Sequence, residues 1–291
     1  MRFANCVRGS IVLADGAWGT ELQKLGARSG ECIDLWNLTQ PELVGRVAES
    51  YIDAGSRVIL TNTFRANPAS HAEFDLQRNF DAINRAGVRI SRQAARNQAL
   101  VFASMGPSGG RLAKGSLPRN DLIHAFSSQA KALASEGPDA ILLETMTDLV
   151  ETRIAAAAAL ETGLPVIVSF FFDLENGQSK PSTDATPEQA AQILTSDGVQ
   201  GIGANCGSGV REFIPLCKRL RSASPLPIWI KPNAGIPELV RGRACYPVTS
   251  TEFARSAQEF REAGATFLGG CCGTTPEFIR ALAQQQPFAK S

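Results

Sequence analysis

The residues of this chain best suited to chemistry are two adjacent cysteines, Cys271 and Cys272, in the stretch "FLGGCCGTTPE". A shared packing role does not explain them, because neighbouring side chains on a strand point to opposite faces. A disulfide between them would need a distorted peptide unit. A third cysteine, Cys206, lies in the similar stretch "GANCGSG". Three thiolates and one open coordination position are typical of a catalytic zinc site, because soft sulfur ligands select zinc and the vacant position admits a substrate.

The remaining four cysteines lack this glycine-rich setting at a strand end. We expect them to be buried small side chains, because free cysteine is among the most buried residue types. The odd total of seven cysteines and an N-terminal stretch without the apolar core of a signal peptide argue against a disulfide framework. Both features indicate reduced thiols in the cytoplasm. The four residues are Cys6, Cys32, Cys217 and Cys245.

Eight short apolar runs alternate with eight longer amphipathic segments, and these elements must position the cysteines. Near-continuous apolar runs are typical of parallel strands that are buried on both faces. Eight strand–helix units predict an α/β fold, a single (β/α)8 TIM barrel over residues 1–291, in preference to an open doubly wound sheet. The predicted strands are 11–17, 57–64, 100–107, 140–145, 165–172, 201–206, 227–234 and 266–272. The predicted helices are 41–54, 75–98, 119–136, 148–162, 187–197, 209–222, 250–263 and 275–285.

In such barrels catalytic residues emerge at the C-terminal ends of the strands. The sixth and eighth predicted strands carry the three cysteines at these ends, and only one strand separates them around the ring. We therefore expect the thiols to converge, with Cys206 within about 7 Å of the other two if all three bind one zinc ion. The polar residues at the strand ends are Asp15, Asn62, Ser104, Glu144, Ser169, Cys206, Asn233 and the pair Cys271–Cys272.

Four further side chains have a functional and a structural reading. Asp15 precedes Gly16, and Asp-Gly is also a common turn pair. Glu144 ends the apolar run "AILLE", where a carboxylate is either functional or one partner of a buried ion pair. Trp18 and Trp36 offer cation–π contact to a cationic ligand, but ordinary packing is the simpler expectation for both.

The composition excludes two classes of partner. The net charge is +1 and no basic run appears, so nothing favours nucleic acid. The longest apolar stretch, 154–160, is far too short to cross a bilayer, so no membrane partner is expected. A hydrophobic content of 44% is typical of a globular protein with a large core.

Six motifs, taken in order, resemble the homocysteine S-methyltransferase family, which includes betaine–homocysteine methyltransferase and the homocysteine module of cobalamin-dependent methionine synthase. They cover most of the chain, and a lone cysteine pair would be far less specific. The motifs are "LADGAWGTELQKLG" (13–26), "ILTNTF" (59–64), "LLETMTD" (142–148), "GANCGSG" (203–209), "IKPNAG" (230–235) and "GGCCGT" (269–274).

The resemblance implies a zinc-dependent enzyme that transfers a methyl group to the thiolate of homocysteine and forms methionine. Cys206, Cys271 and Cys272 match the family's zinc ligands. Asp15 and Glu144 match acidic residues that hold homocysteine, chiefly through its amino group. Asn233 matches a residue that can occupy the fourth zinc position before homocysteine arrives. Asn62 matches a residue that lines the pocket floor.

The methyl donor is not encoded in these motifs. Betaine, a sulfonium compound and a methylcorrinoid on a separate protein all remain open, and the loops 106–120 and 173–185 are expected to decide among them. Two other readings also stay open. One is a redox-sensing thiol cluster on a barrel of different activity, and the other is a methyltransferase subunit that docks a corrinoid carrier protein.

Overall fold

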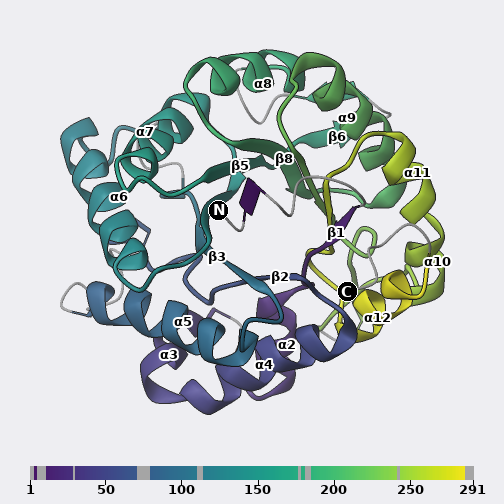
Figure 1. Cartoon of the computed structure of the whole chain (residues 1–291), viewed down its shortest axis with the longest axis horizontal. Coiled ribbons are helices and arrows are strands. Elements are labelled where there is room, and N and C mark those ends of the chain that lie inside the picture. Colours follow the sequence, from purple (N-terminus) through teal and green to yellow (C-terminus); the bar gives the residue numbers. More distant parts are fainter. Residues whose placement is uncertain are drawn as a thin grey trace.

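The computed structural model describes residues 3–4, 11–28, 30–70, 79–109, 114–175, 178–180, 185–240 and 243–285. Its centre is a ring of eight parallel strands surrounded by helices (Figure 1). The order around the ring is β1, β12, β9, β8, β5, β4, β3, β2, and a parallel bridge between Ala14 and Val58 joins the first strand to the last. The predicted (β/α)8 barrel is therefore confirmed, whereas its extension over the full range 1–291 as one domain stays a prediction.

Six of the eight ring strands are shorter than the apolar runs that predicted them, whereas β8 matches its run and β4 extends one residue beyond its run. Those six runs continue beyond the ladder into loops at the C-terminal ends of the strands, where the functional side chains lie. The strands are β1 (Val12–Leu13), β2 (Val58–Leu60), β3 (Leu100–Met105), β4 (Ala140–Met146), β5 (Val166–Phe170), β8 (Gly201–Cys206), β9 (Ile228–Pro232) and β12 (Phe267–Leu268).

The helices around the ring confirm most of the predicted segments. Hydroxyl caps and proline at the first turn fix several of their starts, as at Thr186 before α8 and Thr275 before α12. The helices are α2 (Trp18–Lys24), α3 (Trp36–Thr39), α4 (Pro41–Ala54), α5 (Phe80–Ala95), α6 (Arg119–Ala134), α7 (Leu149–Leu160), α8 (Pro187–Ser196), α9 (Val210–Ala223), α10 (Ser250–Arg255), α11 (Ala257–Glu262) and α12 (Pro276–Ala283).

Several features differ from the predicted elements, and α2 and α3 were not predicted at all. The segment 250–263 is two short helices that meet at Ser256 rather than one helix. The start predicted for the helix 75–98 lies outside the described residues, and α5 ends at Ala95. Two antiparallel hairpins were not predicted, β6 (Asp173–Glu175) with β7 (Gln178–Lys180) and β10 (Glu238–Val240) with β11 (Arg243–Cys245).

The side chains inside the ring change from apolar to polar along the strands. Near the N-terminal end, the rings of Phe102, Trp229 and Phe267 pack together, and Phe3 closes this end with ring centroids 6.2 Å from Phe267 and 6.0 Å from Phe102. Two residues further along β9, the inward position is Lys231. A polar floor of buried or half-buried side chains therefore lies above the apolar plug.

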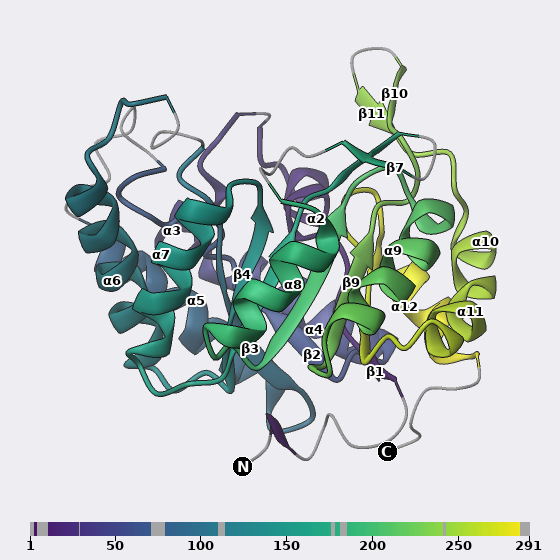
Figure 2. The ribbon, with the colours of Figure 1, turned by 90° about the horizontal axis from the view of Figure 1, so that it is seen from above.

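The opposite end of the barrel carries the long loops. The β10–β11 hairpin projects from this end, away from the N-terminal segment (Figure 2). Parts of both loops, 106–120 and 173–185, lie outside the described residues. Their predicted role in choosing a donor is therefore untested. No helix in the described ranges is both long and apolar enough to cross a membrane.

Candidate metal and substrate site

The three predicted cysteines converge. The Sγ atoms of Cys206, Cys271 and Cys272 all lie within 4.8 Å of one another, and those of Cys206 and Cys271 are 3.0 Å apart. Ligands in a tetrahedral zinc–thiolate site are roughly 3.8 Å from one another, given zinc–sulfur bonds of about 2.3 Å. The cluster is well inside the expected limit, and its spacing needs only small side-chain movements to fit a metal ion.

The backbone of strand β9 holds the two ends of this cluster together. The amide of Cys271 donates to the carbonyl of Pro232 at 2.8 Å, and the carbonyl of Cys272 accepts from the amide of Ala234 at 3.0 Å. Because β9 pairs with both β8 and β12, it brings Cys206 to the adjacent pair. The convergence predicted from strand order is confirmed.

Glycines near the pair serve different purposes. A Cβ at Gly269 would lie 2.5 Å from the carbonyl oxygen of Asp15, so this position requires the close approach of two strand ends. Gly273 has a φ of +82°, which disfavours other residues. Cys206 itself has a φ of 67°, which is uncommon for a residue with a side chain. The turn after β8 thus places the Cys206 thiol at a conformational cost.

Burial and hydrogen bonds divide the protons among the thiols unequally. Hydrogen bonds from Cys206, then Cys271, and a weaker one from Tyr246, lower the pKa of Cys272 to about 3. The hydrogen bonds to its two neighbours and burial raise the pKa of Cys206 well above its usual value. These hydrogen bonds favour the thiolate form at Cys272 over that at Cys206.

Asn205 links this cluster to strand β4. It is fully buried, and its Nδ2 lies 3.5 Å from the Sγ of Cys206 and 3.9 Å from that of Cys271. The same amide donates to Thr145 Oγ1 at 2.7 Å, and its Oδ1 accepts from the amide of Thr145 at 2.8 Å and from Ser169 Oγ at 2.6 Å. Thr145 has a φ of 58°, which is strained for a β-branched residue.

The hydrogen bonding of the Asn233 side chain bears on whether the predicted site can hold a metal ion. Its Nδ2 donates to the carbonyl of Gly207 at 2.7 Å, which fixes the orientation of the amide. Its Oδ1 is buried and has no hydrogen-bond partner among the described residues. Buried polar atoms are nearly always satisfied, so this orphaned oxygen, on a residue whose backbone amide donates to the carbonyl of Cys206 at 3.2 Å, fits a metal ligand. The three sulfurs and this oxygen form a donor set that suits zinc.

A cavity of about 260 Å³ opens beside the cysteines. It is large enough for a small amino acid, and its walls are mostly apolar. Titratable groups line it at Asp34, Arg65, Glu144 and Lys231, along with the three cysteines. The rest of the lining comes from the ends of β1 and β2 and the segments after them, including Trp18, Ile33, Asn62 and Phe64.

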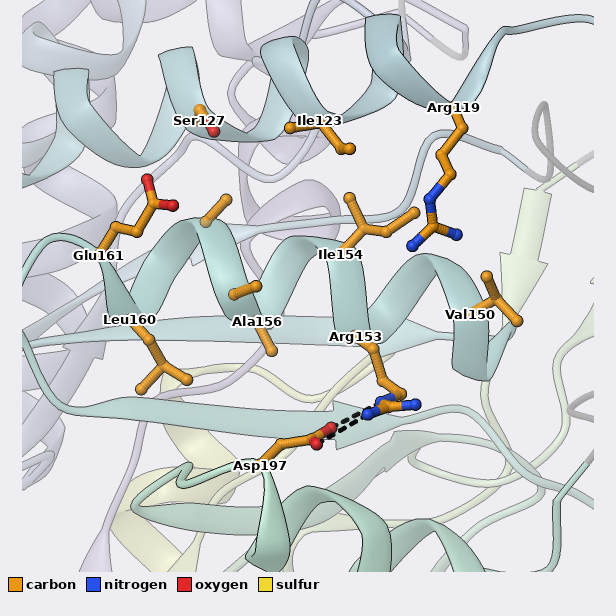
Figure 3. Close-up of a pocket in the computed structure, with 12 residues that line it drawn as sticks. Arg119, Ile123, Ser127, Val150, Arg153, Ile154, Ala156, Leu160, Glu161 and Asp197 are labelled. Carbon is orange, nitrogen blue, oxygen red and sulfur yellow. Dashed lines mark hydrogen bonds and ion pairs between the residues drawn. The ribbon is translucent and has the colours of Figure 1, made fainter.

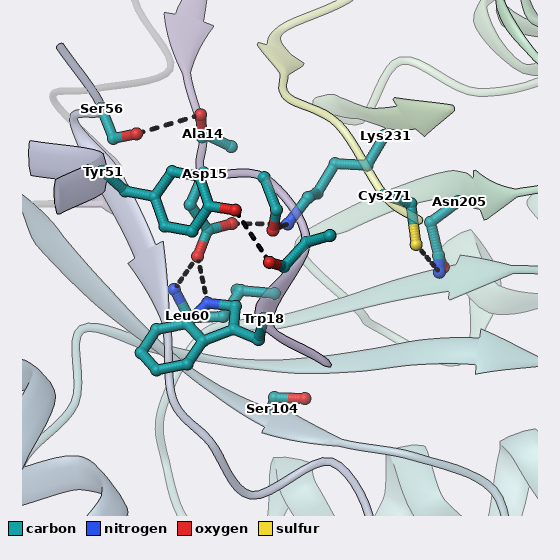
Figure 4. Close-up of polar contacts among 12 residues, drawn as sticks. Ala14, Asp15, Trp18, Tyr51, Ser56, Leu60, Ser104, Asn205, Lys231 and Cys271 are labelled. Carbon is teal, nitrogen blue, oxygen red and sulfur yellow. Dashed lines mark hydrogen bonds and ion pairs between the residues drawn. The ribbon is translucent and has the colours of Figure 1, made fainter. Parts of the chain in front are cut away.

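Asp15 is fully buried and hydrogen-bonds to three residues that line the cavity, Lys231, Trp18 and Leu60 (Figure 4). Its Oδ1 accepts from Lys231 Nζ at 2.5 Å. Its Oδ2 accepts from Trp18 Nε1 at 2.7 Å and from the amide of Leu60 at 2.8 Å. The carboxylate thus ties β1 to β2 and β9. Trp18 packs against the core as expected, and its indole also holds Asp15.

Glu144 is half-buried and faces the cavity. The hydroxyl of Ser104, from the neighbouring strand β3, donates to its Oε1. Burial raises the pKa of Glu144 to about 7, and the positive charge of Lys231 opposes this rise. The carboxyl group therefore titrates near neutrality and lies close to a cation.

Asn62 holds the cavity wall in place. Its Nδ2 donates to the carbonyl of Ile33 at 2.7 Å and to Asn37 Oδ1 at 3.1 Å. Nearby, Asp34 is buried and accepts from the amide of Arg65 at 2.9 Å, and burial raises its pKa to about 6. Asn62 and Asp34 thus fasten the segments after β1 and β2 to each other.

Several site residues were not predicted from the sequence. Lys231 is the plainest, and its signal was a lysine inside the apolar run "PIWIKPNA". Asn205 and Thr145 each directly adjoin a predicted residue, but no pattern marked them. Tyr246 follows the unpredicted β10–β11 hairpin and hydrogen-bonds to Cys272.

The expectation for the remaining cysteines holds only in part. Cys32 and Cys217 are buried, as expected. Cys245 is exposed on β11, so the expectation of burial was wrong there because the hairpin carries it away from the barrel. Cys6 lies outside the described residues.

The outer surface has other hollows without this chemistry. A groove of about 510 Å³ runs between α6 and α7, where Ile123, Val150 and Ile154 lie beside Arg119 (Figure 3). At its edge, Arg153 Nε donates to Asp197 Oδ2 at 2.7 Å. These charged side chains point outward or pair with each other, so the groove offers no convergent catalytic groups.

Comparisons with known proteins agree with this geometry. The family model described as Homocysteine S-methyltransferase matches residues 12–286. Methionine synthase from Mycobacterium tuberculosis is 29% identical over 94% of this chain, which spans only 24% of that protein. Homocysteine S-methyltransferase 4 from Zea mays is 28% identical over 95% of this chain and 89% of its own length.

Solved structures show the same architecture. The oxidized form of the homocysteine methyltransferase MmuM from Escherichia coli is 26% identical, with a TM-score of 0.75 over 94% of this chain and 96% of its own. Its metallated form has a TM-score of 0.80 at 24% identity, over 96% of this chain and 98% of its own, and supports the fold.

Proposed function

This chain belongs to the homocysteine S-methyltransferase family, and from that premise we propose that it is a zinc-dependent methyltransferase that forms methionine from homocysteine. The observation that carries the proposal is the convergence of three cysteine sulfurs within 4.8 Å beside a cavity that also exposes Glu144. The cavity of about 260 Å³ suits an amino acid of this size. The free thiols of the cluster are consistent with a reducing, cytoplasmic location.

Cys206, Cys271 and Cys272 would hold the metal ion, and the orphaned Oδ1 of Asn233 would complete its shell when no substrate is present. A metal ion held by these three cysteines would supply a site at which the substrate thiol binds as a thiolate, and the three protein thiolates would keep that sulfur electron-rich enough to act as a nucleophile. Asn205 restrains the sulfurs of Cys206 and Cys271 through its buried amide. Such outer contacts orient metal ligands and affect metal affinity.

Asp15 and Glu144, the acidic pair that matches the family's, would form the end of the site that receives the ammonium group of homocysteine. Glu144 faces the cavity, and Asp15 lies behind Lys231 and Trp18. Asn62 holds the floor of the cavity through Ile33 and Asn37. With the substrate anchored at its amino end, the thiol would lie toward the cysteines. Methyl transfer then requires little beyond alignment of the sulfur with the donor methyl group.

The donor is proposed to be betaine, a sulfonium compound or a methylcorrinoid. The sulfur would form a bond to the methyl carbon as the bond from that carbon to the donor breaks, and the donor would leave with the electron pair. Similarity to one module of methionine synthases makes a separate corrinoid protein a second candidate partner. A panel of donors with homocysteine as acceptor, read as methionine formed, would identify the donor.

Metal content tests the site itself. We expect about one zinc ion per purified chain, lost on Cys272→Ala. Cys245→Ser is the matched control, because this thiol is exposed on a hairpin away from the cluster. Full zinc occupancy in a protein that lacks all three cluster cysteines would contradict the proposal.

The same experiment separates the redox alternative, which the 3.0 Å approach of Cys206 and Cys271 favours. A redox sensor would be purified without zinc and would form a disulfide reversibly under mild oxidants. A zinc-loaded protein that forms methionine excludes that reading. Activity with free betaine or a free sulfonium donor would count against an obligatory carrier protein.

A further inference from the structure

Lys231 is a buried cation that the proposed reaction does not yet use. It is 2% exposed, on the inner face of β9, and its Nζ is 5.8 Å from the ring centroid of Trp229 below it. A buried ammonium group loses its hydration and persists only where neighbouring groups compensate it. Its partners therefore reveal what it does.

Asp15 is the direct partner of Lys231. The Nζ atom is 2.5 Å from Asp15 Oδ1 and 3.5 Å from the carbonyl of Gly16. Asp15 Oδ2 already accepts two hydrogen bonds, from Trp18 Nε1 and from the amide of Leu60 (Figure 4). The Asp15 carboxylate accepts hydrogen bonds from three donors of the protein and has no exposed surface. Its acceptor positions are therefore already used within the protein.

Glu144 is in a different situation. Only the Ser104 hydroxyl donates to it among the residues that the structure describes, and its side chain lines the cavity together with Lys231. Asp15, Glu144 and Lys231 together carry a single negative charge, and the opposite charges of Asp34 and Arg65, which also line the cavity, offset each other. One ammonium group from a ligand would neutralise the single negative charge.

We propose that Lys231 is a positioning residue that occupies Asp15 permanently, so that Glu144 alone receives the ammonium group of the substrate amino acid. The inference rests on the proposed function and divides the roles within its acidic pair. An ammonium group at Asp15 would have to displace one of its three donors and would compete with Lys231 for the same carboxylate. Glu144 also feels the charge of Lys231, but no hydrogen bond joins the two among the described residues, so its carboxylate keeps acceptor positions for a ligand. Asp15 instead fixes Trp18 and the end of β2, which form one wall of the cavity.

The test measures the affinity of the zinc-loaded protein for two ligands, homocysteine and 4-mercaptobutyrate. The second is the same thiol acid without the amino group. The variants are Glu144→Gln and the double variant Asp15→Asn with Lys231→Met. In the double variant the asparagine Oδ1 can still accept from Trp18 and Leu60, and no buried charge is left unpaired. Lys218→Met is the control, because this lysine is exposed on α9.

We expect Glu144→Gln to reduce the preference for homocysteine about tenfold or more, and the double variant to keep that preference. A double variant that loses the preference, or a Glu144→Gln protein that keeps it, overturns the assignment. Failure of both thiols to bind the wild-type protein would instead contradict the proposed function.

A second measurement decides the pairing independently of any ligand. Thermal unfolding of metal-free protein is compared for Asp15→Asn, Lys231→Met and the double variant. Each single change leaves a buried charge unpaired, so we expect the double variant to unfold at a higher temperature than Lys231→Met alone. Strictly additive losses would show that Lys231 does not act through Asp15.

Discussion

At the scale of single residues, the site depends on charges that are held in place at a cost in stability. Glu144 shows this most directly, because burial raises its pKa from 4.5 to about 7 even though Lys231 lies nearby. The groups whose charges act on it are Lys231, Asp15 and Cys271, and Ser104 donates to it. In the ammonium-binding role proposed for it, Glu144 must be ionised, yet burial favours its neutral form.

This arrangement predicts how stability varies with pH. A carboxyl group whose pKa is higher in the folded protein than in the unfolded chain retains its proton longer when folded, so its contribution to stability falls as pH rises between the two values. For Glu144 that window is from about 4.5 to about 7. We expect metal-free wild-type protein to lose up to about 3 kcal/mol relative to Glu144→Gln across it.

Chemical denaturation of both proteins at several pH values measures this difference. Glu161→Gln provides the control, since Glu161 lies at the outer end of α7, away from the cavity. A difference between wild type and Glu144→Gln that does not change with pH would contradict the assignment.

At the scale of elements, the ends of strands β1 and β12 must meet closely to place the cysteine pair. Gly269 is the contact point, because a Cβ there would lie 2.5 Å from the carbonyl oxygen of Asp15. The next amide, that of Gly270, donates to the same oxygen at 3.0 Å. The separation of these two strands is therefore set by backbone atoms rather than by side chains.

Gly269→Ala should lower both stability and zinc affinity, because the strand ends must separate to admit the new methyl group. We expect a loss of about 1–3 kcal/mol in stability, measured by denaturation. Gly45→Ala, within α4, is the contrast. Its Cβ would meet Ile90 at an ordinary 3.7 Å, and alanine favours helix, so stability should rise by up to about 1 kcal/mol. Zinc affinity unchanged in Gly269→Ala would contradict the role of this contact.

The elements also show where sequence reasoning succeeds. The order of the strands and the identity of the three converging cysteines follow from local patterns, because eight apolar runs and two Cys–Gly stretches are visible in the sequence. The pairing of Lys231 with Asp15 does not, because it joins residues 216 positions apart whose meeting depends on closure of the barrel. The prediction of burial for Cys245 was wrong for a related reason, because nothing in the nearby sequence indicated the hairpin that exposes it.

At the scale of the whole molecule, the two ends of the barrel have separate tasks. Phe3, Phe102, Trp229 and Phe267 fill the N-terminal end, while the thiols and carboxylates lie at the C-terminal end. In barrels of this kind the first end maintains stability and the second carries chemistry. Changes at one end should therefore leave the other largely unaffected.

Phe3→Ala tests this separation. Phe3 is only 8% exposed and packs against two buried rings, so its truncation should cost about 3 kcal/mol of stability. Zinc affinity, measured by chelator competition, should remain within about threefold of wild type. Phe3→Leu is the milder control. A large loss of zinc affinity in a folded Phe3→Ala protein would show that the two ends are coupled.

The left-handed backbone at Thr145 limits how far this barrel can be engineered. Glycine at this position would relieve strain and raise the melting temperature, yet it would also remove the hydroxyl that holds Asn205, and with it a restraint on two thiols. A selection for heat resistance alone would thus favour replacements that weaken metal retention. Thermostable designs from this scaffold should be screened for bound zinc together with melting temperature.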